Sequence, residues 1–183
     1  SIAGHDIVFH FASNADISRA VSEPDIDFEH GTLLTKCVLE AMRINKISDI
    51  VYTSGSGVYG EVPYELISED YSPLIPVSTY GAQKLAGEAL IAAYSYMFDM
   101  RGYVFRFANV VGPRQTHGVA YDFLLKLTKN PKELNIMGDG TQTKPYIHVH
   151  DVISAFSLIT QKGISNAPMF SYFNVASEDT LTE

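Results

Sequence analysis

The sequence predicts an α/β fold in which helices cover both faces of a parallel sheet. Over the first 113 residues, short apolar runs typical of strands alternate with longer segments of helical periodicity. Such alternation is typical of parallel strands joined by right-handed helical crossovers. After Pro113 the pattern changes to shorter strands and helices. We therefore expect a main domain over residues 1–113 and a truncated mixed lobe over 114–183, some segments of which return to the main domain.

The elements expected in the main domain are, in order, strand Asp6–Ala12, helix Asp27–Asn45, strand Asp49–Ser54, helix Ser78–Phe98 and strand Tyr103–Phe107. Ser78 follows Pro76 and is a good N-cap, because its hydroxyl can accept a hydrogen bond from a free amide of the first turn. The apolar stripe of the first helix places Cys37 in the core.

The elements expected in the lobe are helix Tyr121–Thr128, strands Leu134–Met137 and Tyr146–Val149, helix Asp151–Gln161, strand Tyr172–Val175 and the cap and first turn of a helix at Asp179–Glu183. The chain opens directly into its first strand, without an initiator Met. We therefore expect a piece of a longer protein, with strands missing at the N-terminal end.

Composition narrows the class of protein. The chain has 183 residues, 46% of them apolar and 19% charged, which suffices for one substantial core. A net charge of −8 argues against nucleic acid or an anionic membrane as the main partner. One cysteine leaves no intrachain disulfide, and no run approaches the roughly 20 apolar residues of a membrane span. We expect a cytoplasmic protein.

Tyr80 and Lys84 are the most informative pair in the sequence. They are four residues apart, so they share one face of the predicted helix and can act on one substrate atom. An ammonium about 6 Å from a phenol, at an effective dielectric of about 20, favours the phenolate by roughly 2.8 kcal/mol. We therefore expect Lys84 to lower the pKa of Tyr80 by about 2 units and to make it a base.

Four motifs stand around this pair, in a fixed order: Thr53–Gly60, Ser78–Lys84, Arg106–Arg114 and Gly138–Gln142. In that order they resemble the extended short-chain dehydrogenase/reductase family, of the NAD-dependent epimerase/dehydratase type. The resemblance runs from Asp6 to about Asn174 and is closest to nucleotide-sugar epimerases of the UDP-glucose 4-epimerase type. It implies a Rossmann-like fold, NAD as cofactor, a UDP-hexose as substrate and a homodimer joined partly through the helix that carries Tyr80.

The resemblance also implies roles for individual residues. Tyr80 would take the proton of a sugar hydroxyl while the carbon loses hydride to NAD⁺, and Lys84 would hold the nicotinamide ribose. Further cofactor contacts would come from Phe11, Ala12, Ser13, Thr53, Ser54 and Ala108, and substrate contacts from Asn109, Arg114 and Lys144. Lys144 stands where the family commonly has an arginine, so the charge is kept and the bidentate fork is lost.

Two positions depart from the family pattern. Gly55 stands where the family has an active-site Ser or Thr, and Gly31 where it usually has an Asn. Ser54 and Ser56 flank Gly55, and we expect one of them, Ser56 in the first place, to supply the missing hydroxyl. These departures leave open an altered, slower or inactive homologue.

The loop before Tyr59 also bears on the reaction. Related dehydratases carry Asp-Glu where this chain has Ser56-Gly57, and related decarboxylases need a glutamate at the position of Gly57. The favoured reaction is therefore epimerisation at sugar C4 through transient oxidation. A net oxidoreductase or dehydratase of the same superfamily and a non-catalytic NAD-binding homologue remain as alternatives.

Two further patterns could mislead. Residues 55–60 match Gly-x-Gly-x-x-Gly, but Pro63 follows and Tyr80 lies about where the acidic residue of a true fingerprint should be. We interpret this segment as a loop bordering the nicotinamide and expect the phosphate loop upstream of Ser1. His148 and His150 would share one face of a strand, yet two histidines without a third ligand are weak grounds for a metal site, and we expect no metal.

Overall fold

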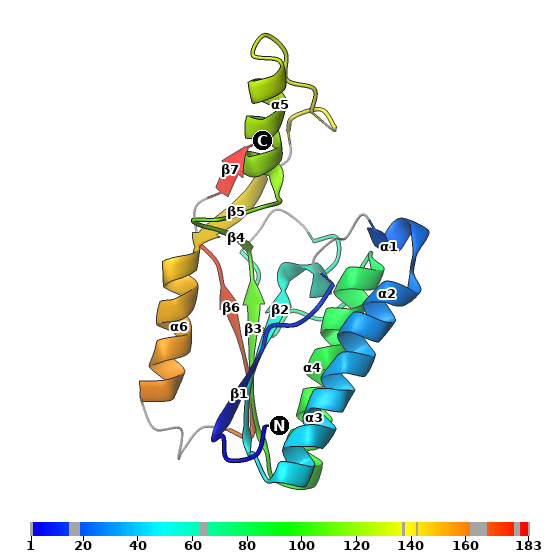
Figure 1. Ribbon diagram of the computed structural model, residues 1–183, viewed down its shortest axis with the longest axis vertical. Coiled ribbons are helices and arrows are strands. Elements are labelled where there is room, and N and C mark those ends of the chain that lie inside the picture. Colours follow the sequence, from blue (N-terminus) through cyan, green and yellow to red (C-terminus); the bar gives the residue numbers. More distant parts are fainter. Residues whose placement is uncertain are drawn as a thin grey trace.

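The main sheet has four parallel strands. The computed structural model describes residues 2–14, 19–62, 66–136, 138–141, 143–161, 168–177 and 180–182. In spatial order the strands are β1 (Ile7–His10), β2 (Asp49–Gly55), β3 (Arg101–Phe107) and β6 (Phe170–Val175). All three neighbouring pairs run parallel, which confirms the predicted Rossmann-like sheet (Figure 1).

Helices cover both faces of this sheet, as predicted (Figure 1). One face carries α1 (Arg19–Ser22), α2 (Asp25–Asp27), the π-helix η1 (Phe28–Leu33), α3 (Leu34–Asn45) and α4 (Thr79–Phe98), and the other carries α6 (Val149–Gln161). Among the described helices, none combines the length and the apolar character needed to cross a membrane.

Strand alternation divides the core into two clusters. Successive side chains of a strand point to opposite faces of the sheet. Ile50 of β2 therefore packs with Leu39 of α3 and Ile91 of α4, while Val51 belongs to the cluster that contains Phe156 of α6. These two layers hold β2 at the centre of the molecule.

A second, smaller sheet lies beyond the carboxyl ends of the main strands (Figure 1). It consists of β4 (Asn109–Val111), β5 (Thr143–His148) and β7 (Thr180–Thr182), with α5 (Val119–Lys129) beside it. β4 and β5 run parallel, whereas β7 is antiparallel to β5. The predicted division of the chain at Pro113 stays a prediction.

Two predicted elements of the lobe are wrong. Residues 134–136 form no strand, and Met137 lies outside the described residues. The predicted helix start at Asp179–Glu183 is instead the strand β7, whose backbone pairs with residues 143–145. Asp179 and Glu183 themselves lie outside the described residues. Pairing with a strand about 37 positions away overrides a local capping signal.

The predicted helix over Asp27–Asn45 is interrupted by η1. A π-helix takes about one more residue per turn than an α-helix, so it changes which side chains face the core. In α3 the buried residues are Thr35, Leu39 and Met42. Cys37 is exposed, so its expected place in the core is wrong.

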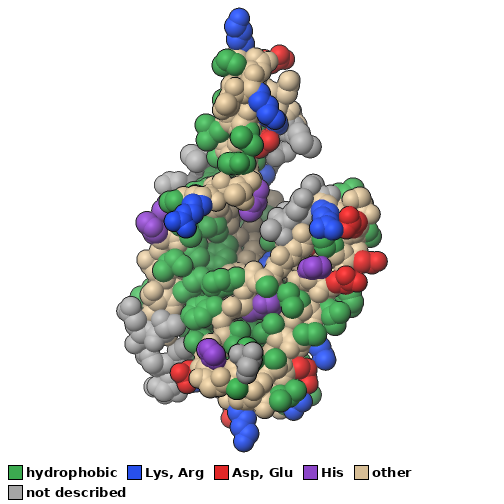
Figure 2. All heavy atoms as spheres, in the orientation of Figure 1, with side chains coloured by type: hydrophobic (Ala, Val, Ile, Leu, Met, Phe, Trp, Pro, Cys, Tyr) green, Lys and Arg blue, Asp and Glu red, His purple; other side chains and the backbone are tan. Residues whose placement is uncertain are grey.

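The face of the molecule toward the viewer in Figure 2 shows hydrophobic side chains gathered over β1 and beside α6. Phe9 and Phe11 at β1 and Ile153 of α6 are exposed. Phe11 stacks on Phe156 with ring centroids 5.3 Å apart, which anchors the segment that follows β1 to α6.

Candidate active site

The expected site residues collect where the parallel strands end. Phe11 and Ala12 follow β1, Gly55 ends β2 and Ala108 follows β3, so all four lie at one edge of the sheet (Figure 1). Helix α4 begins beside this edge. Crevices at the carboxyl ends of such strands are the usual ligand sites of open α/β sheets.

Ser78 fixes where α4 begins. It has an extended backbone, and its side chain accepts a hydrogen bond of 3.0 Å from the Gly81 amide, as an N-cap should. The predicted cap is confirmed. Tyr80 therefore lies in the first turn of α4, one turn before Lys84.

Tyr80 and Lys84 come together on one face of α4. The Lys84 ammonium Nζ lies 5.6 Å from the centroid of the Tyr80 ring and 5.3 Å from that of Tyr52. It donates a hydrogen bond of 2.8 Å to the carbonyl oxygen of Thr53. Lys84 thus joins α4 to the end of β2.

Burial dominates the ionisation of this pair. Lys84 is only 4% exposed, and burial lowers its pKa to about 8. Burial, and then the nearby carboxylate of Asp27, raise the pKa of Tyr80. The expected lowering of the Tyr80 pKa by Lys84 is therefore wrong for this chain: a buried phenolate close to a carboxylate is disfavoured more strongly than the ammonium favours it.

His10 adds a neutral neighbour to Lys84. Its Nε2 lies 2.9 Å from the hydroxyl oxygen of Thr35. Burial, and then the charge of Lys84, lower the pKa of His10 to about 4. At neutral pH the imidazole is therefore uncharged and does not compete with the positive charge of Lys84.

The two serines that flank Gly55 have different surroundings. Ser54 is buried, and its hydroxyl donates to the carboxylate of Glu88. Ser56 is exposed at the start of a short 3-10 turn, η2 (Ser56–Val58). The Ser54 hydroxyl is therefore engaged in the core, and Ser56 is the better candidate of the two for the hydroxyl that Gly55 lacks.

The position of Gly55 can accommodate a Cβ. Its backbone is extended, with φ −162°, which any residue can adopt. A Cβ added there would meet nothing nearer than the Phe107 carbonyl oxygen at 3.8 Å. The Gly-x-Gly-x-x-Gly match opens only the three-residue turn η2, which agrees with our interpretation of it as a loop.

The other expected cofactor residues line the same edge. Phe11 and Ala12 are exposed, and the Ser13 hydroxyl donates to the carbonyl oxygen of Asn14 at 3.3 Å. Ala108 is half-buried, and its amide donates to the Val175 carbonyl oxygen at 3.2 Å.

The expected substrate residues lie on or beside the small sheet. Asn109 is the exposed first residue of β4, and its side-chain amide donates to the Pro145 carbonyl oxygen at 3.3 Å. Lys144 is half-buried on β5, two positions before the partner of Asn109 in the register. Arg114 is exposed in a turn, with φ 67°.

His148 and His150 do not share a strand face. His148 is the last residue of β5, and His150 already belongs to the first turn of α6. The His150 amide donates to Nδ1 of His148 at 3.3 Å, so the His148 ring caps α6. Among the described residues, no group of three or more His, Cys, Asp or Glu side chains could hold a metal ion.

A buried carboxylate lies beside Tyr80 that sequence reasoning missed. Asp27 is 1% exposed and accepts hydrogen bonds from the side chains of Asn14, Thr79 and Gln83. A weak signal existed in Gly31, because a glycine inside a helix often marks a close contact. A Cβ on Gly31 would overlap the Gln83 side-chain oxygen.

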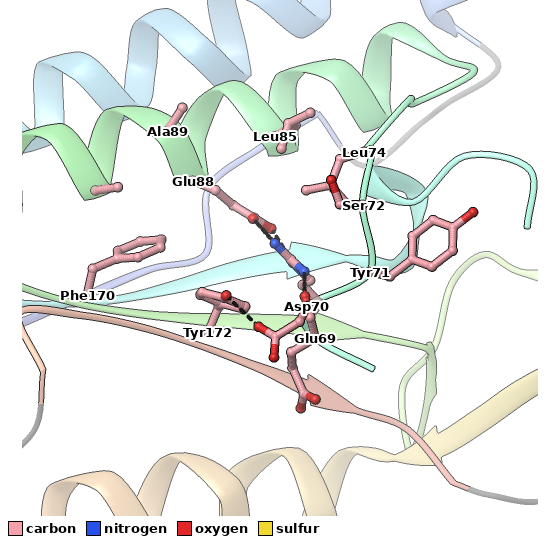
Figure 3. A pocket seen from close by; sticks show the side chains of 12 residues that line it. Glu69, Asp70, Tyr71, Ser72, Leu74, Leu85, Glu88, Ala89, Phe170 and Tyr172 are labelled. Carbon is pink, nitrogen blue, oxygen red and sulfur yellow. Dashed lines mark hydrogen bonds and ion pairs between the residues drawn. The ribbon is translucent and has the colours of Figure 1, made fainter. Parts of the chain in front are cut away.

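A cavity of about 360 Å³ lies elsewhere, between α4 and β6 (Figure 3). Neither Tyr80 nor Lys84 lines it. The buried ion pair of Arg106 and Glu88, 2.7 Å apart, forms part of its wall. Arg106 also donates to the carbonyl oxygen of Glu69 in the loop before α4, at 3.0 Å.

The same loop is tied to β6. The Asn174 amide donates to the Glu69 carboxylate at 2.9 Å, and its side chain donates to the Ile67 carbonyl oxygen at 2.9 Å. Tyr172 donates to Asp70, also at 2.9 Å, as Figure 3 shows. These contacts hold the loop before α4 against β6, at the wall of the cavity.

Comparisons with known proteins agree with this architecture. The model of the NAD dependent epimerase/dehydratase family matches residues 1–176. UDP-glucose 4-epimerase of Mycolicibacterium smegmatis is 35% identical over 155 residues, covering 82% of this chain and 49% of that protein. The dTDP-D-glucose 4,6-dehydratase of Dictyostelium discoideum is 29% identical over 168 residues, covering 86% of this chain and 39% of that protein.

A solved structure gives the same picture. The crystal structure of the Thermus thermophilus UDP-glucose 4-epimerase complex with NAD superimposes with a TM-score of 0.80 at 30% identity, covering 97% of this chain and 58% of that one. The chain spans about half the length of the proteins it matches, from 39% to 58%. The fold, the strand-end site and these matches agree. The chain belongs to the NAD dependent epimerase/dehydratase family.

Proposed function

We propose that the protein containing this chain is an NAD-dependent nucleotide-sugar epimerase that inverts C4 of a UDP-hexose, interconverting UDP-glucose and UDP-galactose. The observation that carries the proposal is the pairing of Tyr80 and Lys84 on one face of α4, with the ammonium 5.6 Å from the phenol ring. The pair lies at the edge where ligands of open α/β sheets bind.

Tyr80 is the group that takes the proton from the sugar hydroxyl and returns it. Because burial and Asp27 raise its pKa, Tyr80 stays protonated at neutral pH, and it needs positive charge nearby to act as a base. Lys84 supplies that charge below its pKa of about 8. Among the described residues Lys84 donates one N–H to Thr53, which would leave two of its three donors for ribose hydroxyls.

The residues at the strand ends fit a flat cofactor ring. Ala12 and Ala108 have small side chains, and Gly55 has no neighbour within 3.8 Å of where its Cβ would be. Lys84 would hold the ribose beside them. Bound NAD supplies the hydride acceptor and donor for the sugar carbon.

The small sheet would hold the rest of the substrate. Lys144 and Arg114 supply positive charge suited to a diphosphate, against a net chain charge of −8. Asn109 can donate to and accept from a uracil or sugar group. The exposed Ser56 would replace the hydroxyl absent at Gly55.

We include a homodimer in the proposal. Helices α3 and α4 leave large apolar side chains exposed, of which Ile44 is 68% exposed and Tyr96 and Met97 are each 70% exposed. A second copy of the same helices would cover them.

The test is conversion of UDP-galactose to UDP-glucose by the full-length protein that contains these 183 residues, with catalytic NAD⁺. We expect Tyr80→Phe to lower turnover by about 10²- to 10⁴-fold, the usual contribution of a general acid–base group. Stoichiometric reduction of NAD⁺ would instead identify a net oxidoreductase. Absence of turnover on UDP-hexoses, with NAD still bound, would favour the non-catalytic homologue that Gly55 leaves open.

A further inference from the structure

Asp27 is a buried charge that the proposed reaction does not use. It is the last residue of α2 and is 1% exposed. Burying a carboxylate is costly unless hydrogen bonds replace its water shell. A fully buried carboxylate beside a reactive tyrosine therefore needs a physical reason.

Two segments of the chain supply three hydrogen bonds to Asp27. Asn14, next to Ser13 in the loop after β1, donates its amide to Oδ1 at 2.8 Å. The Thr79 hydroxyl donates to Oδ2 at 2.7 Å, and the Gln83 amide donates to Oδ1 at 3.2 Å. The donors to Asp27 within the described part of the chain are all neutral. One carboxylate thus joins α2, the loop after β1 and the start of α4.

The two donors on α4 flank Tyr80. Thr79 precedes it directly, and Gln83 follows it by three residues, which is close to one helical turn. Two bonds from one turn to the same fixed carboxylate restrain both the rotation of α4 about its axis and its shift along it. The direction of the Tyr80 ring depends on both.

Gln83 is held from the other side by Gly31. The Gln83 side-chain oxygen occupies the space that a side chain at position 31 would need, so that a Cβ on Gly31 would overlap it. Gln83 Oε1 is one of the buried oxygens that have no hydrogen-bond partner within the described residues. The Gln83 amide thus directs its N–H toward Asp27, and its oxygen is left without a hydrogen-bond partner among the described residues.

From this geometry we propose that Asp27, with Gln83 seated over Gly31, is a positioning residue that fixes the turn of α4 that carries Tyr80 and places a negative charge beside it. This inference rests on the proposed function, in which Tyr80 moves the proton. Within the described part of the chain, the ionisable groups that interact with Tyr80 are Asp27 from α2, Lys84 from its own helix and Tyr52 from β2. Asp27 contributes a negative charge that opposes the phenolate, and its hydrogen bonds hold the helix turn.

Two substitutions at Asp27 separate the charge from the bonds. Asp27→Asn can keep all three contacts, because Oδ1 still accepts from Asn14 and Gln83 while the new amide donates to the Thr79 hydroxyl. Only the charge is removed. Asp27→Leu removes both the charge and the bonds.

The first measurement needs no substrate. The Tyr80 phenol is titrated by NMR in full-length protein labelled with ¹³Cζ-tyrosine, its signal assigned by its absence in Tyr80→Phe. We expect Asp27→Asn to lower the Tyr80 pKa by at least 0.5 unit. An unchanged Tyr80 pKa would overturn the electrostatic half of the inference, whether or not the protein proves to be an epimerase.

The second measurement is turnover. We expect Gln83→Met, which keeps the volume and loses the amide, to lower kcat at least tenfold with KM changed less than twofold, and Asp27→Leu to lower kcat further. Ser95→Ala is the matched control, because Ser95 is buried on the same helix about four turns away. If Gln83→Met and Asp27→Leu keep the wild-type kcat, the positioning role is refuted. If the wild type itself has no turnover, the proposed function fails and the titration alone decides the role of Asp27.

Discussion

Replacing Lys84 by Met should separate stability from activity. Lys84 is 4% exposed and lies against the rings of Tyr52 and Tyr80. Met has a similar length and no charge, so it can fill the same space. We expect Lys84→Met to abolish epimerase turnover and to leave a protein that is at least as stable at neutral pH.

The size of the expected change in stability follows from the pKa of Lys84. Burial lowers the pKa of Lys84 from 10.5 to about 8. This difference corresponds to roughly 3 kcal/mol by which burial disfavours the ammonium relative to the neutral amine. The variant also loses the hydrogen bond to the Thr53 carbonyl oxygen, and this loss destabilises it by about 1–3 kcal/mol. At pH 7 we therefore expect the variant to be more stable by about 1 kcal/mol.

The pH dependence is the sharper test. Between pH 8 and 10.5 the unfolded wild type binds more protons at Lys84 than the folded protein does, so its stability rises with pH in that window. Below pH 8 the full cost of the buried ammonium is present. Relative to Lys84→Met, the free energy of unfolding of the wild type should therefore rise by roughly 3 kcal/mol from pH 7 to pH 10.5.

Urea unfolding of both proteins at a series of pH values, without added NAD, measures this difference. Titrating groups that Lys84 does not influence are common to both proteins and cancel, and His10, with a pKa of about 4 in the wild type, lies below this pH window. A difference that stays constant within about 1 kcal/mol, or that moves in the opposite direction, would refute the assignment of Lys84 as a buried ammonium.

Four further predictions concern other residues near the site. Ser54→Ala should lower the unfolding free energy by about 1–3 kcal/mol with turnover unchanged, since its hydroxyl binds Glu88 in the core. Ser56→Ala should lower turnover and leave the unfolding free energy unchanged. Unchanged turnover in this variant would remove Ser56 from the site. Gly55→Ser should fold with stability within about 0.5 kcal/mol of wild type, because its Cβ has 3.8 Å of clearance, and should raise kcat in the epimerase assay; a fall in kcat would mean that the open space itself is needed. Arg106→Met should lower the urea midpoint by the equivalent of about 3–5 kcal/mol, because it strands the Glu88 carboxylate, and a loss below about 1 kcal/mol would contradict a buried pair.

Local patterns in the sequence suffice to predict the parallel main sheet and the shared helix face of Tyr80 and Lys84. Strand and helix periodicity is a property of neighbouring residues, and the four-residue spacing fixes the shared face of α4 by helix geometry alone. The strand boundaries moved by a few residues, as in Arg101–Phe107 against the predicted Tyr103–Phe107. The N-cap Ser78 was found because its signal is also local.

The parts that could not be predicted depend on residues far apart in the chain. Asp27 meets Thr79 across 52 positions and Gln83 across 56 positions. The direction of the Tyr80 pKa shift depends on burial, which the spacing of Tyr80 and Lys84 does not reveal. The strand β7 pairs with β5, whose residues lie about 37 positions earlier in the chain.

The contacts between the loop before α4 and β6 bear on the order in which the chain acquires its shape. Asn174 reaches Glu69 and Ile67 across 105 and 107 positions. On the ribosome, that loop can gain these contacts only after more than a hundred further residues have been made. We expect a chain ended at residue 168 to be cut by protease near residues 66–77, where a chain that includes β6 resists. The segment leading into Tyr80 thus comes early in synthesis and is among the last to be fixed.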